Sequence, residues 1–286
     1  MAGLTIILPA CNEAAEIGGC LSALLAAEPK PGYGSGSIPV PMPIEVIVAA
    51  NGCTDDTAAL ARSFAPSFAQ MGWDFRVLEL AEGSKIAALN AADAQARHGA
   101  RAYLDADVRL SPPLLDQLAR ALQTDKPLYA SGRCQIAPAK TPVSRAYRQF
   151  YALVPFMSTG VAGCGLFGVS RAGRRRWGVF PDIISDDTFV RLSFAPHERL
   201  LLRACYAWPL VEGFGNLLRV RRRQNIGVAE VARRFPNLLK NDDTPALTPA
   251  SLLGLVLRAP VGFAVYGAVA LLTRFGRRSR EWSRGR

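Results

Sequence analysis

Two pairs of aspartates have the residue type and spacing that chemistry at a phosphate or a hydroxyl group needs. Asp105 and Asp107 stand two apart directly after the apolar residues 102–104, where a buried strand is expected to end. Side chains two apart on an extended chain point to the same side. Two carboxylates placed in this way can hold Mg²⁺ or Mn²⁺ together with the oxygens of a bound diphosphate. The same residues also suit an acidic loop that caps a following helix near Ser111.

The second pair, Asp186 and Asp187, lies far downstream and precedes the apolar residues Phe189 and Val190. A positioned carboxylate can take the proton from an acceptor hydroxyl, which is a poor nucleophile until it loses that proton. The simpler interpretation is that Asp186 caps the N-terminus of a helix. Taken alone, this pattern favours the cap.

Alternating strands and helices are expected to position the first pair. Apolar runs of strand length occur at residues 4–8, 45–49, 75–80 and 102–104. Helices are expected after Asn12, after Thr54 or Asp55, and over residues 85–97, and the residues 29–43, rich in Pro, Gly and Ser, are expected to form a loop. This order predicts an α/β fold with a mostly parallel, doubly wound sheet flanked by helices.

Charge and cysteine content narrow the classes of partner. The formal net charge of +11 indicates an anionic partner, which can be a nucleotide diphosphate, acidic lipid headgroups or nucleic acid. The six cysteines are scattered without a C-x-x-C pair, which argues against a zinc site and against a disulfide framework. The first residues also lack the pattern of an export signal. We therefore expect a cytoplasmic protein with reduced thiols.

The residues 251–273 form an apolar segment near the C-terminus. Arg258 and Pro260 interrupt it, and a central arginine costs about 2.5 to 3.5 kcal/mol on membrane-insertion scales. Basic residues flank the segment on both sides, which suits a helix lying shallowly in an anionic membrane surface. A helix buried in the protein core is the alternative.

Five segments, taken in order, resemble the family 2 glycosyltransferases of the GT-A fold. They are IILPACNE at 6–13, NGCTDDT at 51–57, GSKIAALN at 83–90, DAD at 105–107 and SDD at 185–187. The resemblance extends over about residues 4–225. It implies a nucleotide-sugar donor, Mg²⁺ or Mn²⁺ as cofactor, and a single inverting displacement without a covalent sugar on the enzyme.

The resemblance also implies roles for individual residues. Donor contacts are implied for Pro9, Ala10, Glu13, Asn51, Asp55, Lys85, Asn90 and Asp105. Arg222 or Arg223 could reach the diphosphate, and the alternative is that both lie on a solvated basic helix face. Asp107 is implied as the chief metal ligand with Asp105 beside it, and Asp187 as the general base with Asp186 next to it. The glycine-rich loop with Gly163 and Gly165 is implied on the acceptor side, or it is a tight turn between strands.

Two departures from the family pattern refine the expected activity. Many members carry an aspartate that binds the base ahead of the glycine turn, whereas this chain has Ala50 and Asn51, so the donor base is left open. The Gln-x-x-Arg-Trp element of processive members is only approximated by residues 219–224, which predicts transfer of a single sugar. The expected acceptor is a hydroxyl of a lipid-linked or membrane-proximal molecule, with the protein peripheral at the cytoplasmic face of the membrane.

This interpretation divides the chain into three consecutive segments: a nucleotide-sugar-binding half over 1–130, an acceptor-binding half over 131–230 and a membrane-associating tail over 231–286. A sugar nucleotidyltransferase would need a glycine-rich, arginine-containing loop after the first strand, which is missing. A nucleic-acid-binding protein would explain the arginines but neither acidic pair, so no nucleic-acid partner is expected. A non-catalytic membrane scaffold would tolerate replacement of Asp107 and Asp187. The oligomeric state is not indicated.

Overall fold

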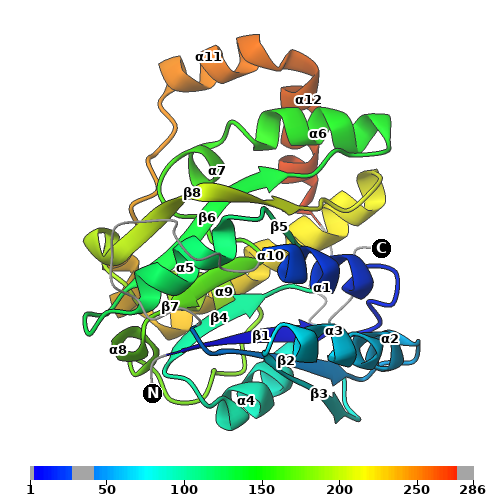
Figure 1. Ribbon diagram of the computed structural model, residues 1–286. Coiled ribbons are helices and arrows are strands. Elements are labelled where there is room, and N and C mark those ends of the chain that lie inside the picture. The colour runs from blue at the N-terminus through cyan, green and yellow to red at the C-terminus, as the bar shows by residue number, and fades with distance from the viewer. Residues whose placement is uncertain (1–2, 28–41, 276–286) are drawn as a thin grey trace. The chain divides into compact units, whose positions relative to one another are not determined.

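The computed structural model describes residues 3–27 and 42–275 (Figure 1). Its strands are β1 (Leu4–Ala10), β2 (Ile44–Asn51), β3 (Asp74–Leu80), β4 (Ala100–Leu104), β5 (Arg109–Leu110), β6 (Tyr129–Ile136), β7 (Leu166–Val169) and β8 (Arg199–Trp208). Its α-helices are α1 (Ile17–Ala26), α2 (Thr57–Ser63), α3 (Ala65–Gln70), α4 (Lys85–Gln95), α5 (Leu114–Leu122), α6 (Pro142–Tyr151), α7 (Pro155–Ser158), α8 (Arg171–Arg174), α9 (Asp186–Leu192), α10 (Phe214–Arg234), α11 (Pro249–Arg258) and α12 (Pro260–Leu272). The loop expected at 29–43 lies outside the described residues up to position 41.

The strands form one eight-stranded sheet in the order β3-β2-β1-β4-β7-β6-β8-β5. β1 pairs in parallel with β2 and β4, and β2 pairs in parallel with β3. These pairings confirm the expected alternation of strands and helices over the first 104 residues. The pairs β4–β7, β7–β6 and β8–β5 are antiparallel, so the sheet is mixed and its parallel part includes β3, β2, β1 and β4.

Helices cover both faces of the parallel half of the sheet. The chain moves outward from β1 to β2 to β3 and then returns across the sheet to β4. Because parallel connections are right-handed, this reversal places α1 to α3 on one face and α4 on the other. α4 packs on β1 and β2, and every residue of those two strands is buried. The carboxyl ends of these four parallel strands therefore lie at one common edge of the sheet, and the loops that follow them start from that edge.

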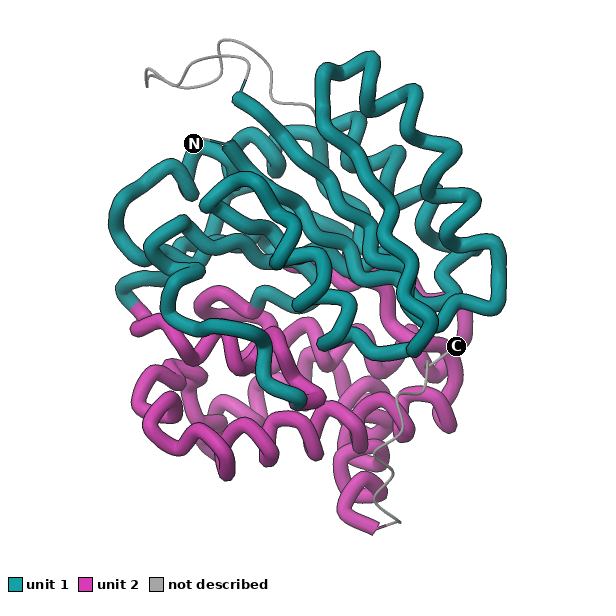
Figure 2. Tube along the Cα trace, turned by 90° about the horizontal axis from the view of Figure 1, so that it is seen from below, with its two compact units in different colours: residues 1–133, 163–182, 197–207 teal, residues 134–162, 183–196, 208–286 magenta. Residues whose placement is uncertain are grey.

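The chain forms two compact units (Figure 2). Unit 1 comprises residues 1–133, 163–182 and 197–207 and contains nearly all of the sheet. Unit 2 comprises residues 134–162, 183–196 and 208–286 and is mainly helical. The two differ in charge: unit 1 has 16 Lys and Arg against 16 Asp and Glu, and unit 2 has 18 against 7. The whole excess of positive charge therefore belongs to unit 2.

Unit 2 has its own aromatic and aliphatic core, to which the C-terminal apolar segment contributes. α12 packs on α6, where Gly262 lies against the main chain of Ala146 and against Phe150. Val269 of α12 is fully buried in the same cluster. One face of the second half of the apolar segment thus packs on the core of unit 2, as the alternative of a core helix expects, whereas Leu271 and Leu272 at its end are exposed. Pro260 starts this helix, because a proline ring is tolerated in a first turn but not in a helix interior.

α11, by contrast, presents apolar side chains at the surface. Leu253 and Leu257 are 60% and 75% exposed, and Val261, at the start of α12, is 66% exposed. Leu252 and Leu255 on the other side of α11 pack against the core of unit 2. No helix within residues 3–27 and 42–275 is both long and apolar enough to cross a membrane.

Candidate functional site

The candidate donor-binding residues of unit 1 cluster at the carboxyl edge of the parallel strands. Pro9 and Ala10 end β1, Asn51 ends β2, and Asp105 follows β4. Lys85 begins α4, directly after the loop of residues 81–84 that follows β3. Because these strands run parallel, loops that are far apart in the sequence meet at one edge of the sheet.

The loops after β1 and β2 are tied together by side-chain hydrogen bonds. Asn12 has a positive φ of 54°, a conformation that asparagine tolerates better than most residues. Its Oδ1 accepts from the hydroxyl of Thr54 at 3.1 Å and from the N–H of Asp55 at 3.2 Å. The carboxylate of Asp55 in turn accepts from Ala14 N and Thr57 N, each at 3.1 Å. Asn12, expected only as a helix cap, is therefore the link between two loops, and α1 begins five residues later.

Asn51 and Glu13 are also engaged in this link. Asn51 is 2% exposed, and its amide donates to the carbonyl oxygens of Ala10 at 2.9 Å and Ala49 at 3.2 Å. The main-chain N–H of Glu13 donates to the hydroxyl of Thr57 at 2.6 Å. The side-chain amide of Asn51 thus joins the end of β2 to the end of β1.

Asp105 and Asp107 lie in a turn between β4 and β5. The N–H of Val108 donates to Asp105 O at 3.1 Å, and the N–H of Asp105 donates to Gly165 O at 2.8 Å. Strand alternation therefore does not apply to this pair, because neither residue is in a strand. The alternative of an acidic helix cap is not seen either: α5 starts after Pro113 without a side-chain cap.

Lys85 supplies a positive charge to this turn. Its Nζ lies 3.1 Å from Asp105 Oδ1, and both side chains are partly exposed, at 25% and 36%. Ser84 caps α4 by accepting from Ala87 N at 3.2 Å, which confirms a helix start at Lys85. One cation and two carboxylates thus occur together at the edge of the sheet.

This set of side chains fits a metal that shares its ligands with a substrate. Within the described part of the chain, no group of three or more His, Cys, Asp or Glu residues could hold a metal ion by protein ligands alone. Mg²⁺ is commonly held by one or two carboxylates with the remaining positions filled by phosphate oxygens and water. Asp105 and Asp107 match that chemistry, whereas a closed all-protein metal site does not fit.

Cys20 lies beneath the same turn and is chemically inert. Its Sγ lies 3.7 Å from Asp105 O, as a weak donor to that oxygen. Complete burial raises the pKa of the Cys20 thiol far above its usual range, and nearby carboxylates add to the rise. The thiol therefore packs under the turn and takes no part in its chemistry.

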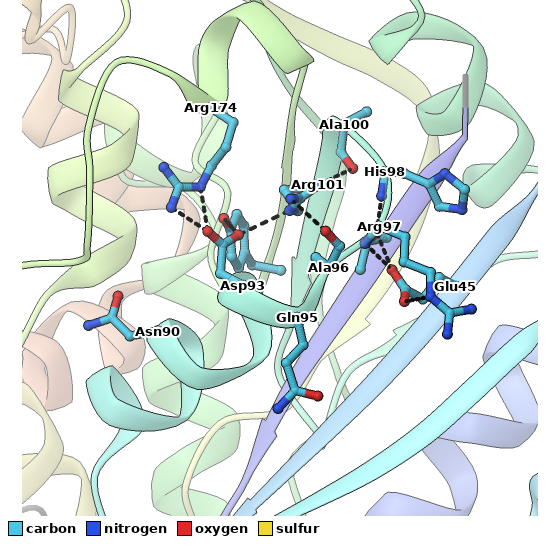
Figure 3. A network of polar contacts seen from close by, with 12 residues as sticks. Glu45, Asn90, Asp93, Gln95, Ala96, Arg97, His98, Ala100, Arg101 and Arg174 are labelled. Carbon is cyan, nitrogen blue, oxygen red and sulfur yellow. Dashed lines mark hydrogen bonds and ion pairs between the residues drawn. The ribbon is translucent and has the colours of Figure 1, made fainter. Parts of the chain in front are cut away.

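Asn90 on α4 holds the segment that follows α8, and Asp93 on the same helix pairs with Arg174 at the end of α8 (Figure 3). The amide of Asn90 donates to Phe180 O at 3.1 Å and accepts from Phe180 N at 2.7 Å. Asp93 accepts from Arg101 Nε at 3.1 Å and from Arg174 Nε at 2.9 Å. The side chain of Asn90 is thus hydrogen-bonded to the main chain of Phe180, and Arg174 is paired with Asp93 inside unit 1.

A second polar network stabilises the opposite, amino-terminal edge of the sheet (Figure 3). Glu45 is fully buried and accepts from the hydroxyl of Thr5 at 2.6 Å and from Arg97 N at 2.8 Å, and it pairs with Arg76. Burial by itself would raise the pKa of Glu45, but these hydrogen bonds and the arginine charge hold it below its usual value. His98 is half-buried beside this network, and burial lowers its pKa. These residues hold the scaffold and lie away from the candidate site.

The glycine-rich loop of unit 1 supports the turn that carries Asp105. Gly163 and Gly165 both have positive φ, of 67° and 71°. A Cβ on Gly163 would lie 1.7 Å from Tyr129 Oη. Between them, Cys164 O accepts from the hydroxyl of Tyr206 at 2.8 Å. Glycine is therefore required here by backbone conformation and by close packing.

Replacing Gly163 with alanine is expected to destabilise unit 1 by at least about 2 kcal/mol, because a non-glycine residue at this φ is strained and its Cβ displaces Tyr129. Urea denaturation measures the loss. The matched control is Gly178→Ala, since nothing lies within 4 Å of a Cβ at that position. Equal stability of the two variants would contradict the packing argument.

Asp186 and Asp187 are the first two residues of α9 in unit 2. Ser185 precedes them at the cap position without a side-chain cap hydrogen bond, so Asp186 is not the cap. Asp186 is 3% exposed, whereas Asp187 is half-buried and accepts from Thr188 N at 2.7 Å. Of the pair, Asp187 is the more accessible carboxylate.

Arg222 and Arg223 lie in the middle of the 21-residue helix α10 of unit 2. Arg222 donates to Leu272 O at 2.9 Å and to Phe275 O, which are main-chain acceptors at the C-terminal end of α12. A cation at a helix C-terminus is favourable because the last carbonyl groups have no intrahelical partner. Arg222 thus fastens α12 to α10.

The sequence model of glycosyl transferase family 2 matches residues 5–176, more than half of the chain. Three solved structures share the fold. The mannosyltransferase PcManGT from Pyrobaculum calidifontis, in complex with GDP-Man and Mn²⁺, has 18% identity and a TM-score of 0.57 over 96% of this chain and 76% of its own. Glucosyl-3-phosphoglycerate synthase from Mycobacterium tuberculosis, with Mn²⁺, UDP and glucosyl-3-phosphoglycerate, has 15% identity and a TM-score of 0.51 over 82% and 80%. Residues 1–349 of TarS from S. aureus have 14% identity and a TM-score of 0.50 over 97% and 93%.

A search of curated protein sequences found no match. The fold and the family match nevertheless define a class: the protein is a glycosyltransferase with the GT-A fold. The chain belongs to glycosyltransferase family 2. The expected fold and enzyme class are both confirmed.

Proposed function

We propose that the protein transfers a single sugar from a nucleotide-sugar donor to an acceptor hydroxyl, with inversion at the anomeric carbon. The observation that carries the proposal is the turn with Asp105 and Asp107, paired with Lys85 at the carboxyl edge of the parallel strands. The solved structures of PcManGT and of glucosyl-3-phosphoglycerate synthase hold Mn²⁺ with a nucleotide or nucleotide sugar. We infer that the diphosphate of the donor needs positive charge at this turn, as a metal ion would supply.

On the donor side, we assign Asp107 and Asp105 as ligands of Mg²⁺ or Mn²⁺. When bound, that ion supplies positive charge that stabilises the departing diphosphate. Lys85 adds a second positive charge, and its pairing with Asp105 keeps it at the turn. Pro9, Ala10 and Glu13 are assigned to the wall of the nucleotide site, at the end of β1 and in the loop that follows.

Three residues expected to contact the donor make hydrogen bonds that hold the loops of unit 1. The side chains of Asn51, Asp55 and Asn90 are hydrogen-bonded to main-chain groups of unit 1. We propose that they shape the nucleotide site by fixing its loops. Because Asn51 is buried, we infer that the donor base is recognised by other groups of these loops.

On the acceptor side, we assign Asp187 as the general base. It removes the proton of the acceptor hydroxyl as the bond to the anomeric carbon forms and the bond to the diphosphate breaks. Asp186 is buried beside it, and we assign it a supporting place in the first turn of α9. Gly163 and Gly165 remain proposed for the acceptor side. We keep Arg223 as the candidate contact to the diphosphate, since Arg222 is fastened to α12.

A panel of UDP-, GDP-, CMP- and dTDP-sugars, each with and without Mn²⁺, tests this proposal by thermal shift. A ligand that binds only the native state stabilises it by about 2.7 kcal/mol at a hundred times its Kd. We expect one nucleotide family to raise the melting temperature in an Mn²⁺-dependent way. A folded protein whose melting temperature responds to no donor would remove the support for this site and favour a non-catalytic protein.

We further propose that the acceptor is lipid-linked or membrane-proximal and that the protein is peripheral at the cytoplasmic membrane face. Unit 2 carries the entire positive excess of the chain, which favours anionic lipid headgroups. Leu253, Leu257 and Val261 are exposed beside the exposed Arg258. Apolar side chains next to a basic one suit the interface of a bilayer, where each kind finds its own environment. Beyond Val261, the face of α12 that packs on α6 takes no part in this surface.

Vesicle sedimentation tests the membrane proposal. The wild-type protein is expected to sediment with vesicles that contain phosphatidylglycerol and to be released by salt, since the charge attraction is screened. The double variant Leu253→Ser/Leu257→Ser should bind at least about tenfold more weakly, because it removes two apolar side chains from the interface. Leu200→Ser/Leu201→Ser, at exposed positions of unit 1, is the matched control. Wild-type protein that stays in the supernatant at low salt would refute membrane binding.

A further inference from the structure

The loop that precedes the aspartate pair of unit 2 is held against α10 at two neighbouring positions. The main-chain N–H of Ile184 donates to Glu230 Oε2 over 3.1 Å. At Gly227, a Cβ would lie 2.2 Å from Ser185 Oγ and 3.0 Å from Ile184 Cβ. Residues three apart in a helix lie on one face. Gly227 and Glu230 therefore form a single contact surface, which we call the α10 clamp, for residues 183–185.

The carboxylate of Glu230 is oriented for this contact. Its side chain is 12% exposed, and its other oxygen, Oε1, lies 3.3 Å from Arg234 Nη1, one turn along the helix. A hydrogen bond from a main-chain N–H to a charged carboxylate is stronger than one between neutral groups. The chain before α9 is thus fastened at a main-chain atom, where a bond restricts the backbone directly.

The other end of α9 is fastened as well. Arg191 is 7% exposed and pairs with Asp242 at 3.2 Å and with Asp243 at 3.4 Å. The amide of Asn241 donates to Leu192 O at 2.8 Å. α9 has only seven residues, and a helix this short is not stable by its own hydrogen bonds. Its position therefore depends on these contacts at its two ends.

We propose that Gly227 and Glu230 are positioning residues for the transfer reaction: by holding residues 183–185, they set the place of Asp187. The inference rests on the proposed role of Asp187 as general base. Asp187 lies three residues after Ile184, so movement of the loop carries its carboxylate along. A proton acceptor works only within hydrogen-bond reach of the reacting hydroxyl, and a misplacement of 1 Å can cost about a hundredfold in rate.

Two substitutions of Glu230 separate its hydrogen bond from its charge. Glu230→Ala removes the acceptor for Ile184 N, whereas Glu230→Gln keeps an acceptor oxygen and loses the negative charge. Val228→Ala, at a half-exposed position of the same helix, is the matched control. Hydrogen exchange of residues 183–192 reports on the clamp. Release of nucleoside diphosphate from GDP-mannose and UDP-glucose with Mn²⁺ reports on the chemistry.

We expect Glu230→Ala to speed exchange in residues 183–192 and to lower kcat at least about tenfold, with the KM for the donor unchanged. Glu230→Gln should restore both readouts most of the way, and Val228→Ala should match the wild type. Unchanged exchange in Glu230→Ala would overturn the clamp. A Glu230→Gln variant as slow as Glu230→Ala would overturn it too, because charge and not the bond to Ile184 would then matter.

The outcome can be distinguished from failure of the proposed function itself. If Asp187→Asn abolishes nucleotide release while Glu230→Ala leaves kcat unchanged, the base assignment stands and the positioning role is refuted. If Asp187→Asn retains the wild-type kcat, the base assignment fails and the positioning role fails with it, whatever the exchange of residues 183–192 shows.

Discussion

Asp187→Asn is expected to lower kcat by a factor of about 10² to 10⁴ while leaving Mn²⁺-dependent nucleotide binding intact. The range is the usual contribution of a general base. Asparagine has nearly the same shape as aspartate but cannot take the proton of the acceptor hydroxyl. Asp187 is half-buried at the start of α9 in unit 2 and accepts from Thr188 N, whereas Asp105 and Asp107 belong to unit 1. Its loss should therefore leave the nucleotide-binding loops unchanged.

The measurement combines nucleotide release from the donor with calorimetry of the nucleoside diphosphate in the presence of Mn²⁺. Asp125→Asn is the control, because Asp125 is an exposed aspartate in the loop after α5. A variant at Asp187 with the activity of the control would rule out Asp187 as the base. A variant that loses nucleotide binding as well would indicate that Asp187 acts on the donor and not on the acceptor.

Asp107→Asn should weaken both nucleotide binding and transfer. Metal ions contribute several kcal/mol of charge stabilisation in such reactions, and a loss of 1.4 kcal/mol is a factor of ten. We therefore expect at least about a hundredfold loss in kcat/KM. The Kd of the nucleoside diphosphate in Mn²⁺ should rise toward its value without metal, because one of the two carboxylates in the turn no longer carries charge.

Calorimetric titrations with and without Mn²⁺ check this expectation. In the wild type, Mn²⁺ should tighten nucleotide binding, and in Asp107→Asn this effect should be small. Lys85 and the backbone bonds of Asp105 are untouched, so the melting temperature without ligand should stay near that of the wild type. An Asp107→Asn variant that keeps the full effect of Mn²⁺ would show that the ion is held elsewhere.

The contrast between these two variants is more informative than either alone. The Asp187 variant should lose chemistry and keep binding, whereas the Asp107 variant should lose both. A non-catalytic scaffold would predict no change in either case. A common loss of folding would show as a lower melting temperature and faster hydrogen exchange across the variant's own unit.

The local elements of unit 1 could be predicted from the sequence, because they depend on short-range patterns. The apolar runs at 4–8 and 75–80 appear within β1 and β3, and the run at 45–49 lies within β2. The helix expected over residues 85–97 is α4, which begins at Lys85 and ends at Gln95. The five family motifs further identified the enzyme class, since their order along the chain is independent of the three-dimensional details.

The tertiary structure alone decided what many of the polar side chains do. Asn51 contacts Ala10 across 41 residues, and Asn90 contacts Phe180 across 90. Such partners leave no periodic signal in the sequence, because a hydrogen bond between distant segments depends on how the strands are ordered in the sheet. For the same reason, the sequence suggests Asn12 as a helix cap, whereas the structure shows it linking two loops.

For the apolar segment at residues 251–273, too, the sequence predicted part of the structure and tertiary packing decided the rest. Its composition and the break at Pro260 were readable in the sequence, and the structure has two helices at that point. Composition could not separate a core helix from a surface helix, because both are apolar. Only the tertiary structure shows that one face of α12 packs on α6 and that Leu253 and Leu257 of α11 lie at the surface.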